Sequence, residues 1–193
     1  LARLSSAAGL ALVSEARASG LKVTCDIAIH HLHLSDMDIG YFDSHARFEP
    51  PLRAASDRSA LRSAAASGLA AVCSDHTPVD EDGKQLPFGE ASPGATSLEL
   101  LLPLALKWAK ETQLPLLTAL ARITCDPATI LGIKSGSLSL GSPADVCIFD
   151  PAESWQLTTG SLRSQGKNTP FLGQELMGRV KTTLMGGRIV FEG

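Results

Sequence analysis

Residues 69–75 (LAAVCSD) are the stretch that indicates the fold, and the residues HTP follow them directly. The run is short and apolar, and it ends in a carboxylate. An apolar run without polar alternation is typical of a parallel strand that is buried on both faces. An acid at the carboxyl end of such a strand points into the mouth of a parallel barrel. Asp75 could bind a metal or act as a general base there, or it could cap the following loop.

Helices and strands alternate on both sides of this stretch. Residues 22–29 are rich in β-branched side chains and partly alternate, which predicts a second strand. Composition and capping residues predict helices at 5–19, 56–68, 97–110, 114–123 and 126–131. Two long loops, 35–56 and 76–96, lie between these elements, and loops of such length often carry function. The order of elements predicts an α/β fold with a parallel sheet.

The composition changes after residue 134, where Gly, Ser, Thr and Val become more frequent. Gly186 and Gly187 separate two strand-like runs and indicate a hairpin turn. We therefore expect a partial barrel domain over residues 1–136 and a smaller β domain over residues 137–193. Strands of the second domain are expected at 145–149, 155–157, 178–185 and 188–192.

Composition and charge argue against several classes of protein. The chain has 193 residues, of which 44% are hydrophobic and 19% charged, as is typical of a globular protein. Its net charge of −3 and its lack of a basic stripe argue against nucleic-acid binding. The longest apolar run, residues 100–106, is far shorter than the roughly 20 residues of a membrane span, so no membrane association is expected. Four cysteines without a Cys-x-x-Cys pair favour reduced, buried thiols in a cytoplasmic protein.

His30, His31 and His33 form a second candidate site where the strand predicted at 22–29 gives way to a loop. On a strand, His31 and His33 would face the same side, which suits a metal site. Asp26 is the only acid placed nearby, and packed or hydrogen-bonded histidines explain the run as well.

Two further segments are compatible with either a functional or a purely structural role. Residues 49–53 (EPPLR) form an extended proline segment with one charge of each sign, which is equally typical of a rigid loop. Residues 93–99 (PGATSLE) indicate a turn that leads into a helix. The start of that helix could hold an anion, and simple helix capping explains the pattern equally well.

Six segments, taken together and in order, resemble the dihydroorotase branch of the amidohydrolase superfamily. The first four are similar to the family patterns VTCEVxPHHL, NPPLR, DHAPH and PGxxGLExxLPL, and the last two to the superfamily's carboxyl-terminal signature. The matching segments are residues 23–34 (VTCDIAIHHLHL), 48–53 (FEPPLR), 74–78 (SDHTP), 93–104 (PGATSLELLLPL), 136–151 (GSLSLGSPADVCIFDP) and 180–191 (VKTTLMGGRIVF). The resemblance therefore covers nearly the whole chain.

This resemblance implies the C-terminal half of a (β/α)8 TIM barrel, together with the C-terminal strands of a small composite β-sandwich. It also implies hydrolysis of a cyclic amide at a binuclear zinc site, in de novo pyrimidine biosynthesis. In that chemistry a bridging hydroxide attacks the ring carbonyl, and the acid at the position of Asp75 moves the proton. The family's His-x-His pair, its carboxylated lysine and one further histidine correspond to positions upstream of Leu1.

Several residues depart from the family pattern. The resemblance places Arg3 and Asp26 at positions that are metal ligands in active relatives, and arginine has no lone pair to donate to zinc. It places Glu49, Val79 and Gly94 in the substrate site, where Glu49 stands for an asparagine and Val79 for a histidine. Because dihydroorotate is an anion, Glu49 adds repulsion and Val79 removes a hydrogen-bond donor.

These departures resemble the non-catalytic branch of the family, which supports the assembly of aspartate transcarbamoylase. We therefore expect a pseudoenzyme with little or no zinc and with aspartate transcarbamoylase as its partner. The alternative is an active zinc-dependent cyclic amidohydrolase that converts dihydroorotate and water to N-carbamoyl-aspartate. We also expect Arg3 and Asp75 to form an ion pair in place of the metal. Half a barrel leaves open sheet edges, which the missing N-terminal half, another chain or a second copy should cover.

Overall fold

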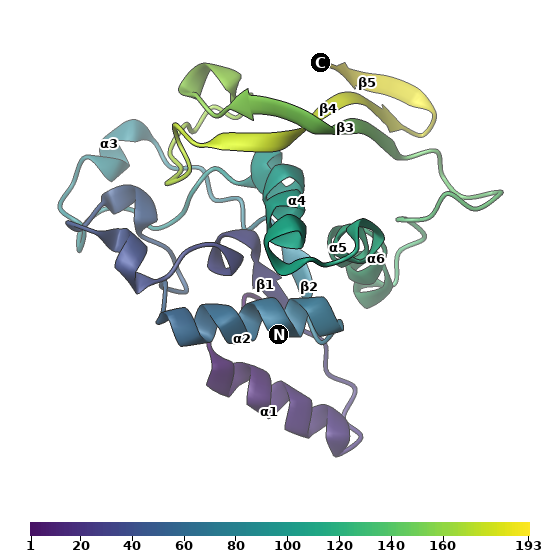
Figure 1. Ribbon diagram of the computed structural model, residues 1–193, viewed down its shortest axis with the longest axis horizontal. Helices are drawn as coiled ribbons and strands as arrows, with labels where there is room; N and C mark the ends of the chain where they lie inside the picture. Colours follow the sequence, from purple (N-terminus) through teal and green to yellow (C-terminus); the bar gives the residue numbers. More distant parts are fainter.

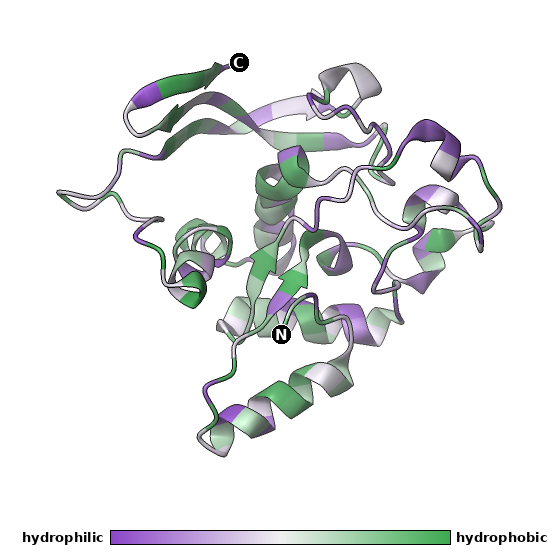
Figure 2. Cartoon of the chain, turned by 180° about the vertical axis from the view of Figure 1, so that it is seen from behind, coloured by the Kyte–Doolittle hydropathy of each residue, from purple (hydrophilic) through white to green (hydrophobic).

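Two short parallel strands, β1 (Asp26–Ala28) and β2 (Ala71–Cys73), lie at the centre of the computed structural model, which describes residues 1–193 (Figure 1). The two strands pair over their whole length. Figure 2 shows that they are largely apolar and run between helices. The buried parallel strand expected within residues 69–75 is therefore confirmed.

The helices pack around this pair of strands. They are α1 (Ala7–Ala18), α2 (Ala55–Ser67), α3 (Glu81–Lys84), α4 (Leu101–Thr112), α5 (Leu116–Ile123) and α6 (Cys125–Leu131). Helix α1 begins where the Ser6 hydroxyl accepts a hydrogen bond from the Gly9 amide at 3.2 Å. Helix α2 ends at Gly68, whose left-handed conformation suits glycine. All of these helices except α3 were expected from the sequence.

One apolar core holds the central strands and the helices together. Ile27 of β1, Leu61 of α2 and Trp108 of α4 are completely buried in it. Burying such a side chain contributes about 1.5–3 kcal/mol each. No helix of the structure combines the length and the apolar character that crossing a membrane requires.

A second, antiparallel sheet lies over one end of α4 (Figure 1). Its strands follow the order β3 (Val146–Gln156), β4 (Glu175–Met185) and β5 (Arg188–Glu192). The turn at Gly186 and Gly187 joins β4 and β5 as predicted. The two strands expected at 145–149 and 155–157 form one strand, β3, because the chain stays paired with β4 across an irregularity that contains Pro151. Proline lacks the amide needed for the ladder, so it is tolerated at such a bulge.

The strand predicted at 22–29 is too long. Only Asp26–Ala28 pair in the sheet, and a 3-10 helix, η1 (Ile29–Leu32), follows at once. All four residues of η1 are buried, so His30 and His31 lie on a helical turn and not on a strand. His31 and His33 therefore do not share one face of a strand, which is the arrangement that would have suited a metal site.

The two long loops contain short helices that the sequence did not predict. These are η2 (Asp36–Ile39) and η3 (Ser44–Ala46) in the first loop and α3 in the second; η4 (Leu98–Leu100) precedes α4, and η5 (Thr159–Ser161) follows β3. Side chains start the two turns of the first loop: Ser35 forms a capping box with Asp38, and Asp43 accepts a hydrogen bond from the His45 amide. Such local bonds leave no hydrophobic periodicity in the sequence.

Residues 1–4 run beside β1 and cover part of its outer edge. The Leu4 amide donates to the Asp26 carbonyl at 2.9 Å, and the Asp26 amide donates to the Leu1 carbonyl at 3.2 Å. Beyond β2, His76 and Ala95 form an isolated parallel bridge. Further covering of the edges by other chains stays a prediction, as does the division of the chain at residues 136 and 137.

Candidate functional site

The candidate site forms where residues 1–4 and the segments that follow β1 and β2 meet. Nη1 of Arg3 lies 3.3 Å from Oδ1 of Asp75, so the expected ion pair is confirmed. The same nitrogen donates to the Glu49 carbonyl at 3.1 Å. The Asp75 side chain is only 11% exposed, whereas that of Arg3 is 46% exposed. The guanidinium thus bridges the carboxylate and the loop that carries Glu49.

Both members of the pair have backbone conformations that are uncommon for residues other than glycine. The φ angle is 56° at Arg3 and 47° at Asp75. Such conformations cost of order 1–3 kcal/mol and persist where the surrounding structure enforces them, often at functional sites. The backbone therefore adopts an uncommon conformation at both residues of the ion pair.

Asp26 belongs to this cluster and is bound through other groups than the Arg3 guanidinium. Its Oδ1 accepts hydrogen bonds from the Arg3 amide at 3.0 Å and from the Cys73 thiol at 3.2 Å. Burial, together with the negative charge of Asp26, raises the pKa of the Cys73 thiol. Cys73 is therefore a neutral donor that helps to hold the Asp26 carboxylate in place.

His30 lies on the other side of Asp75. Its Nε2 is 3.7 Å from Oδ2 of Asp75, and neither ring nitrogen has a hydrogen-bond partner. The ring stacks on Phe48 with a centroid distance of 3.9 Å. Burial lowers the pKa of His30 well below its usual range, and the neighbouring His31 and Arg3 add to this effect. His30 is therefore neutral, and Arg3 is the positive charge that faces Asp75.

The other two histidines of the run are bound elsewhere. His31 Nε2 donates to the Pro51 carbonyl at 3.2 Å, and His33 Nε2 donates to the Leu104 carbonyl at 3.0 Å. Burial lowers the pKa of His33 to about 4. Both residues tie segments of the fold together, which corresponds to the hydrogen-bonded alternative that the sequence left open.

Two residues that organise the site, His76 and Asn168, were not predicted from the sequence. Nδ1 of His76 accepts hydrogen bonds from the amides of Ser97 and Leu98 at 3.1 and 3.2 Å. Asn168 is buried; its side chain accepts from the Val79 amide and donates to the Gly94 carbonyl, both at 3.0 Å. The position of His76 directly after Asp75 was an available signal, whereas nothing local to Asn168 indicates contact with loop 76–96.

The three positions that the resemblance assigned to the substrate site have different structural roles. Glu49 is exposed and contributes its carbonyl to Arg3. Val79 is fixed through its amide, so its side chain adds no donor. Gly94 has φ 122°, and a Cβ atom there would lie 2.6 Å from Cγ2 and 2.7 Å from the carbonyl oxygen of Thr77. Close packing against Thr77 therefore already requires glycine at this position.

The residues of this chain do not by themselves form a zinc centre. The chain contains no group of three or more His, Cys, Asp or Glu side chains arranged to hold a metal ion. The one carboxylate that the resemblance assigns to both metal and catalysis, Asp75, is occupied by the Arg3 guanidinium. A fixed positive charge 3.3 Å from that oxygen repels a cation.

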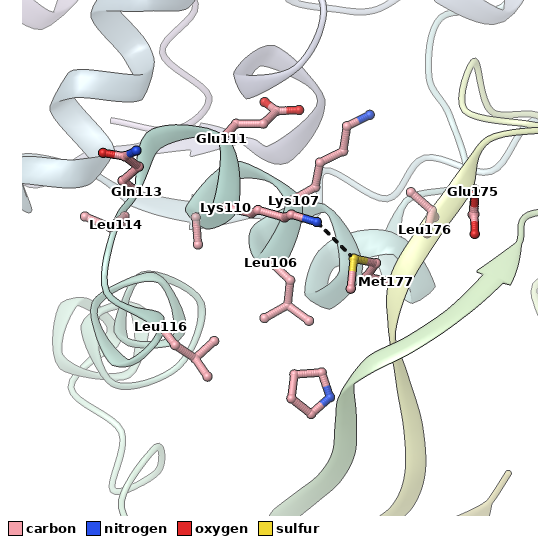
Figure 3. A pocket seen from close by; sticks show the side chains of 12 residues that line it. Leu106, Lys107, Lys110, Glu111, Gln113, Leu114, Leu116, Glu175, Leu176 and Met177 are labelled. Carbon is pink, nitrogen blue, oxygen red and sulfur yellow. Dashed lines mark hydrogen bonds between the residues drawn. The ribbon is translucent and has the colours of Figure 1, made fainter.

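A separate cavity lies away from this site. It has a volume of about 790 Å³ and lies between α4, the start of α5 and strands β3 and β4 (Figure 3). Leu106, Leu116 and Met177 line it, and Lys110 Nζ lies 3.5 Å from the Met177 sulfur. None of its lining residues belongs to the Arg3–Asp75 cluster.

Parallel strands followed by helices, with a carboxylate just beyond one strand end, fit part of an α/β barrel. The model of the amidohydrolase family matches residues 10–190, and the chain belongs to this family. Solved structures agree. An L-hydantoinase from Arthrobacter aurescens superposes with a TM-score of 0.91 at 26% identity, over 99% of this chain and 44% of that one. A dihydroorotase from Saccharomyces cerevisiae has a TM-score of 0.76 at 20% identity, over 94% of this chain and 50% of that one, and shows the fold alone.

Among curated proteins, the chain is similar to dihydroorotases and to dihydroorotase-like proteins. The chain is 43% identical to a dihydroorotase-like protein of Pseudomonas aeruginosa, over 99% of this chain and 45% of the relative. It is 38% identical to a dihydroorotase of Geobacter sp. (strain M21), over 100% of this chain and 45% of the relative. The chain thus spans a little under half the length of these relatives, as the sequence-based assignment to half of a barrel implies.

Proposed function

We propose that the protein is a catalytically impaired, dihydroorotase-like amidohydrolase of pyrimidine biosynthesis that acts as an assembly partner of aspartate transcarbamoylase. The observation that carries this proposal is the ion pair between Arg3 and Asp75. In the family's chemistry the acid at this position needs a metal-bound hydroxide beside it. Here a guanidinium takes that place, and it can supply charge and hydrogen bonds but no coordination site.

The surroundings of the pair support impaired catalysis. Glu49 adds a negative charge next to the position where an anionic substrate would bind. Val79 offers no side-chain donor, and its amide is already bound by Asn168. The relative named dihydroorotase-like protein matches 99% of this chain and 45% of its own length. This similarity favours a protein that resembles the dihydroorotases without their activity.

An active zinc-dependent dihydroorotase is the second candidate, and one observation favours it. Asp75, the acid that the family uses for proton transfer, is retained at the end of β2. The similarity to a dihydroorotase of Geobacter sp. (strain M21) points the same way. This candidate requires that Arg3 leaves Asp75 when metal and substrate bind.

Turnover by the complete protein separates the two candidates. The full-length protein is assayed for conversion of dihydroorotate to N-carbamoyl-aspartate with zinc in excess. We expect no turnover above the uncatalysed rate, and co-elution with the aspartate transcarbamoylase of the same organism in size-exclusion chromatography. Zinc-dependent turnover overturns the impaired assignment, and separate elution of the two proteins at micromolar concentrations overturns the assembly role.

A further inference from the structure

Two loops that are distant in the sequence form one surface beside the candidate site. Residues 36–43 contain η2, residues 80–90 contain α3, and Figure 1 shows these segments side by side. The rings of Phe42 and Phe88 meet edge to face with a centroid distance of 6.0 Å. We call these two segments the acidic aromatic surface.

Large apolar side chains on this surface face the solvent. Met37 is 81% exposed, Tyr41 is fully exposed and Phe42 is 75% exposed. Leu86, from the second loop, is also exposed. Single exposed apolar residues are ordinary, but a group from two joined loops marks an interaction site. Tyr, Phe and Met are also side chains that are enriched at protein–protein interfaces.

The charge of the surface is strongly one-sided. Its 19 residues contain seven exposed carboxylates and one lysine, a formal charge of −6, whereas the whole chain carries −3. The rest of the chain therefore carries +3. The carboxylates belong to Asp36, Asp38, Asp43, Asp80, Glu81, Asp82 and Glu90. Like charges gathered in this way favour a partner of the opposite charge.

The single lysine lies beneath the surface and joins the two loops. Lys84 is buried, and its Nζ donates to the carbonyls of Ser44 and Arg47 at 3.0 and 3.4 Å. In return the Ser44 hydroxyl donates to the Lys84 carbonyl. The Arg47 guanidinium donates to the Ala91 carbonyl at the end of the second loop. These contacts hold the loops in one arrangement, and such preorganisation lowers the entropic cost of binding.

Phe42 is held in a conformation that local energetics disfavour. Its φ angle is 62°, in the left-handed region that bulky side chains rarely adopt. This conformation leaves the ring mostly exposed beside Tyr41 instead of burying it in the core. Strained residues persist where the surrounding structure enforces them, and they concentrate at functional sites.

We propose that the acidic aromatic surface is the docking surface for the assembly partner, which presents lysine and arginine side chains around an apolar depression that receives Tyr41 and Phe42. This inference rests on the proposed assembly role and specifies where the contact is made. The charge of −6 repels nucleic acid and anionic membranes, and it disfavours pairing with the same surface of a second copy. A basic protein surface fits both the charge and the aromatic side chains.

Binding measurements with matched variants test this proposal. The complete protein is immobilised, and its affinity for aspartate transcarbamoylase of the same organism is measured at several salt concentrations. One variant combines Tyr41→Ser with Phe42→Asn, since asparagine tolerates the left-handed backbone. A second combines Asp36→Asn with Asp82→Asn. The control is Leu117→Ser, which removes an 80% exposed apolar side chain from α5.

We expect the aromatic variant to weaken binding by roughly thirtyfold or more, as losing central aromatic anchors does. The aspartate variant should lower the association rate and flatten its salt dependence. The control should bind like the unmodified protein, and circular dichroism should show that all variants are folded. Unchanged binding by both loop variants overturns the assigned surface and leaves the assembly role intact. Absence of binding by the unmodified protein overturns the assembly role and this assignment with it.

Discussion

At the residue scale, the Arg3 guanidinium determines which charge lies beside the Asp75 carboxylate. It provides the only positive charge within ion-pair distance of Asp75, because the neighbouring His30 is kept neutral by burial. Burial raises the pKa of Asp75, and the charge and hydrogen bond of Arg3 act against that rise. Arg3 therefore counteracts the effect of burial on a carboxylate that is only 11% exposed.

Replacing Arg3 by alanine should destabilise the protein at neutral pH. Asp75 would lose its counter-charge, its pKa would rise further, and its ionised form would cost free energy above that pKa. Because Arg3 is half exposed, we expect a loss of about 1–2 kcal/mol rather than the larger loss of a fully buried pair. Denaturant unfolding should show the loss at pH 7 and a smaller one at acidic pH, where Asp75 is protonated.

The matched control is Arg188→Ala, which removes an arginine that forms no ion pair on the β4–β5 hairpin. Its stability should stay within about 0.5 kcal/mol of the parent. An Arg3→Ala protein as stable as this control at pH 7 would contradict the energetic role of the ion pair.

His33 should make stability depend on pH. Burial lowers its pKa to about 4 from the usual 6.5, although Glu111 acts against this and Lys107 and Arg62 add to it. The unfolded chain therefore binds a proton below pH 6.5 that the folded chain does not bind until about pH 4. The stability of the folded state should fall by roughly 3 kcal/mol between these pH values.

A His33→Gln variant provides the comparison, because its amide can still donate to the Leu104 carbonyl. We expect a lower stability at pH 7 and a shallower fall towards pH 4, measured by denaturant unfolding. Parallel pH profiles for the two proteins would exclude His33 as the titrating group.

At the scale of helices and strands, sequence patterns predicted the regular elements and missed the short helical turns. Regular helices and the strand at residues 69–75 were found because their signals are local: capping side chains, apolar runs and glycine at the ends. The turns η1, η2 and α3 were missed, since they depend on side-chain bonds and on tertiary packing. The contacts of Asn168 with loop 76–96 were equally invisible, because they join residues far apart in the chain.

Gly94 offers a test of loop 76–96, which carries two positions that the resemblance assigns to the substrate site, Val79 and Gly94. A Gly94→Ala side chain would meet the Thr77 backbone oxygen at 2.7 Å, which cannot move aside as a flexible side chain can. We expect destabilisation by about 2–4 kcal/mol, from both the positive φ and the overlap. Gly20→Ala is the control, because its φ is also positive but no atom lies within 4 Å of the added carbon. It should cost about 1 kcal/mol in thermal or denaturant unfolding, and equal losses for the two variants would contradict the close approach.

The whole molecule combines a partial barrel with an antiparallel sheet and belongs to the amidohydrolase family. Six motifs in order were enough to predict that family and fold, because they are spread along the chain from residue 23 to residue 191. The joint surface of residues 36–43 and 80–90 could not be predicted from the sequence, since tertiary contacts such as those of Lys84 and Phe42 bring the two loops together. The chain spans about 45% of the length of these curated relatives.

The metal content of the complete protein and of its Arg3→His variant tests the central claim most directly. Both proteins are purified, incubated with zinc, passed through a desalting column and analysed by atomic emission. We predict well under two zinc ions per chain for the unmodified protein, and an increase in the variant, because an imidazole can donate a lone pair where a guanidinium cannot. Two tightly held zinc ions per unmodified chain would contradict the claim that Arg3 replaces the metal.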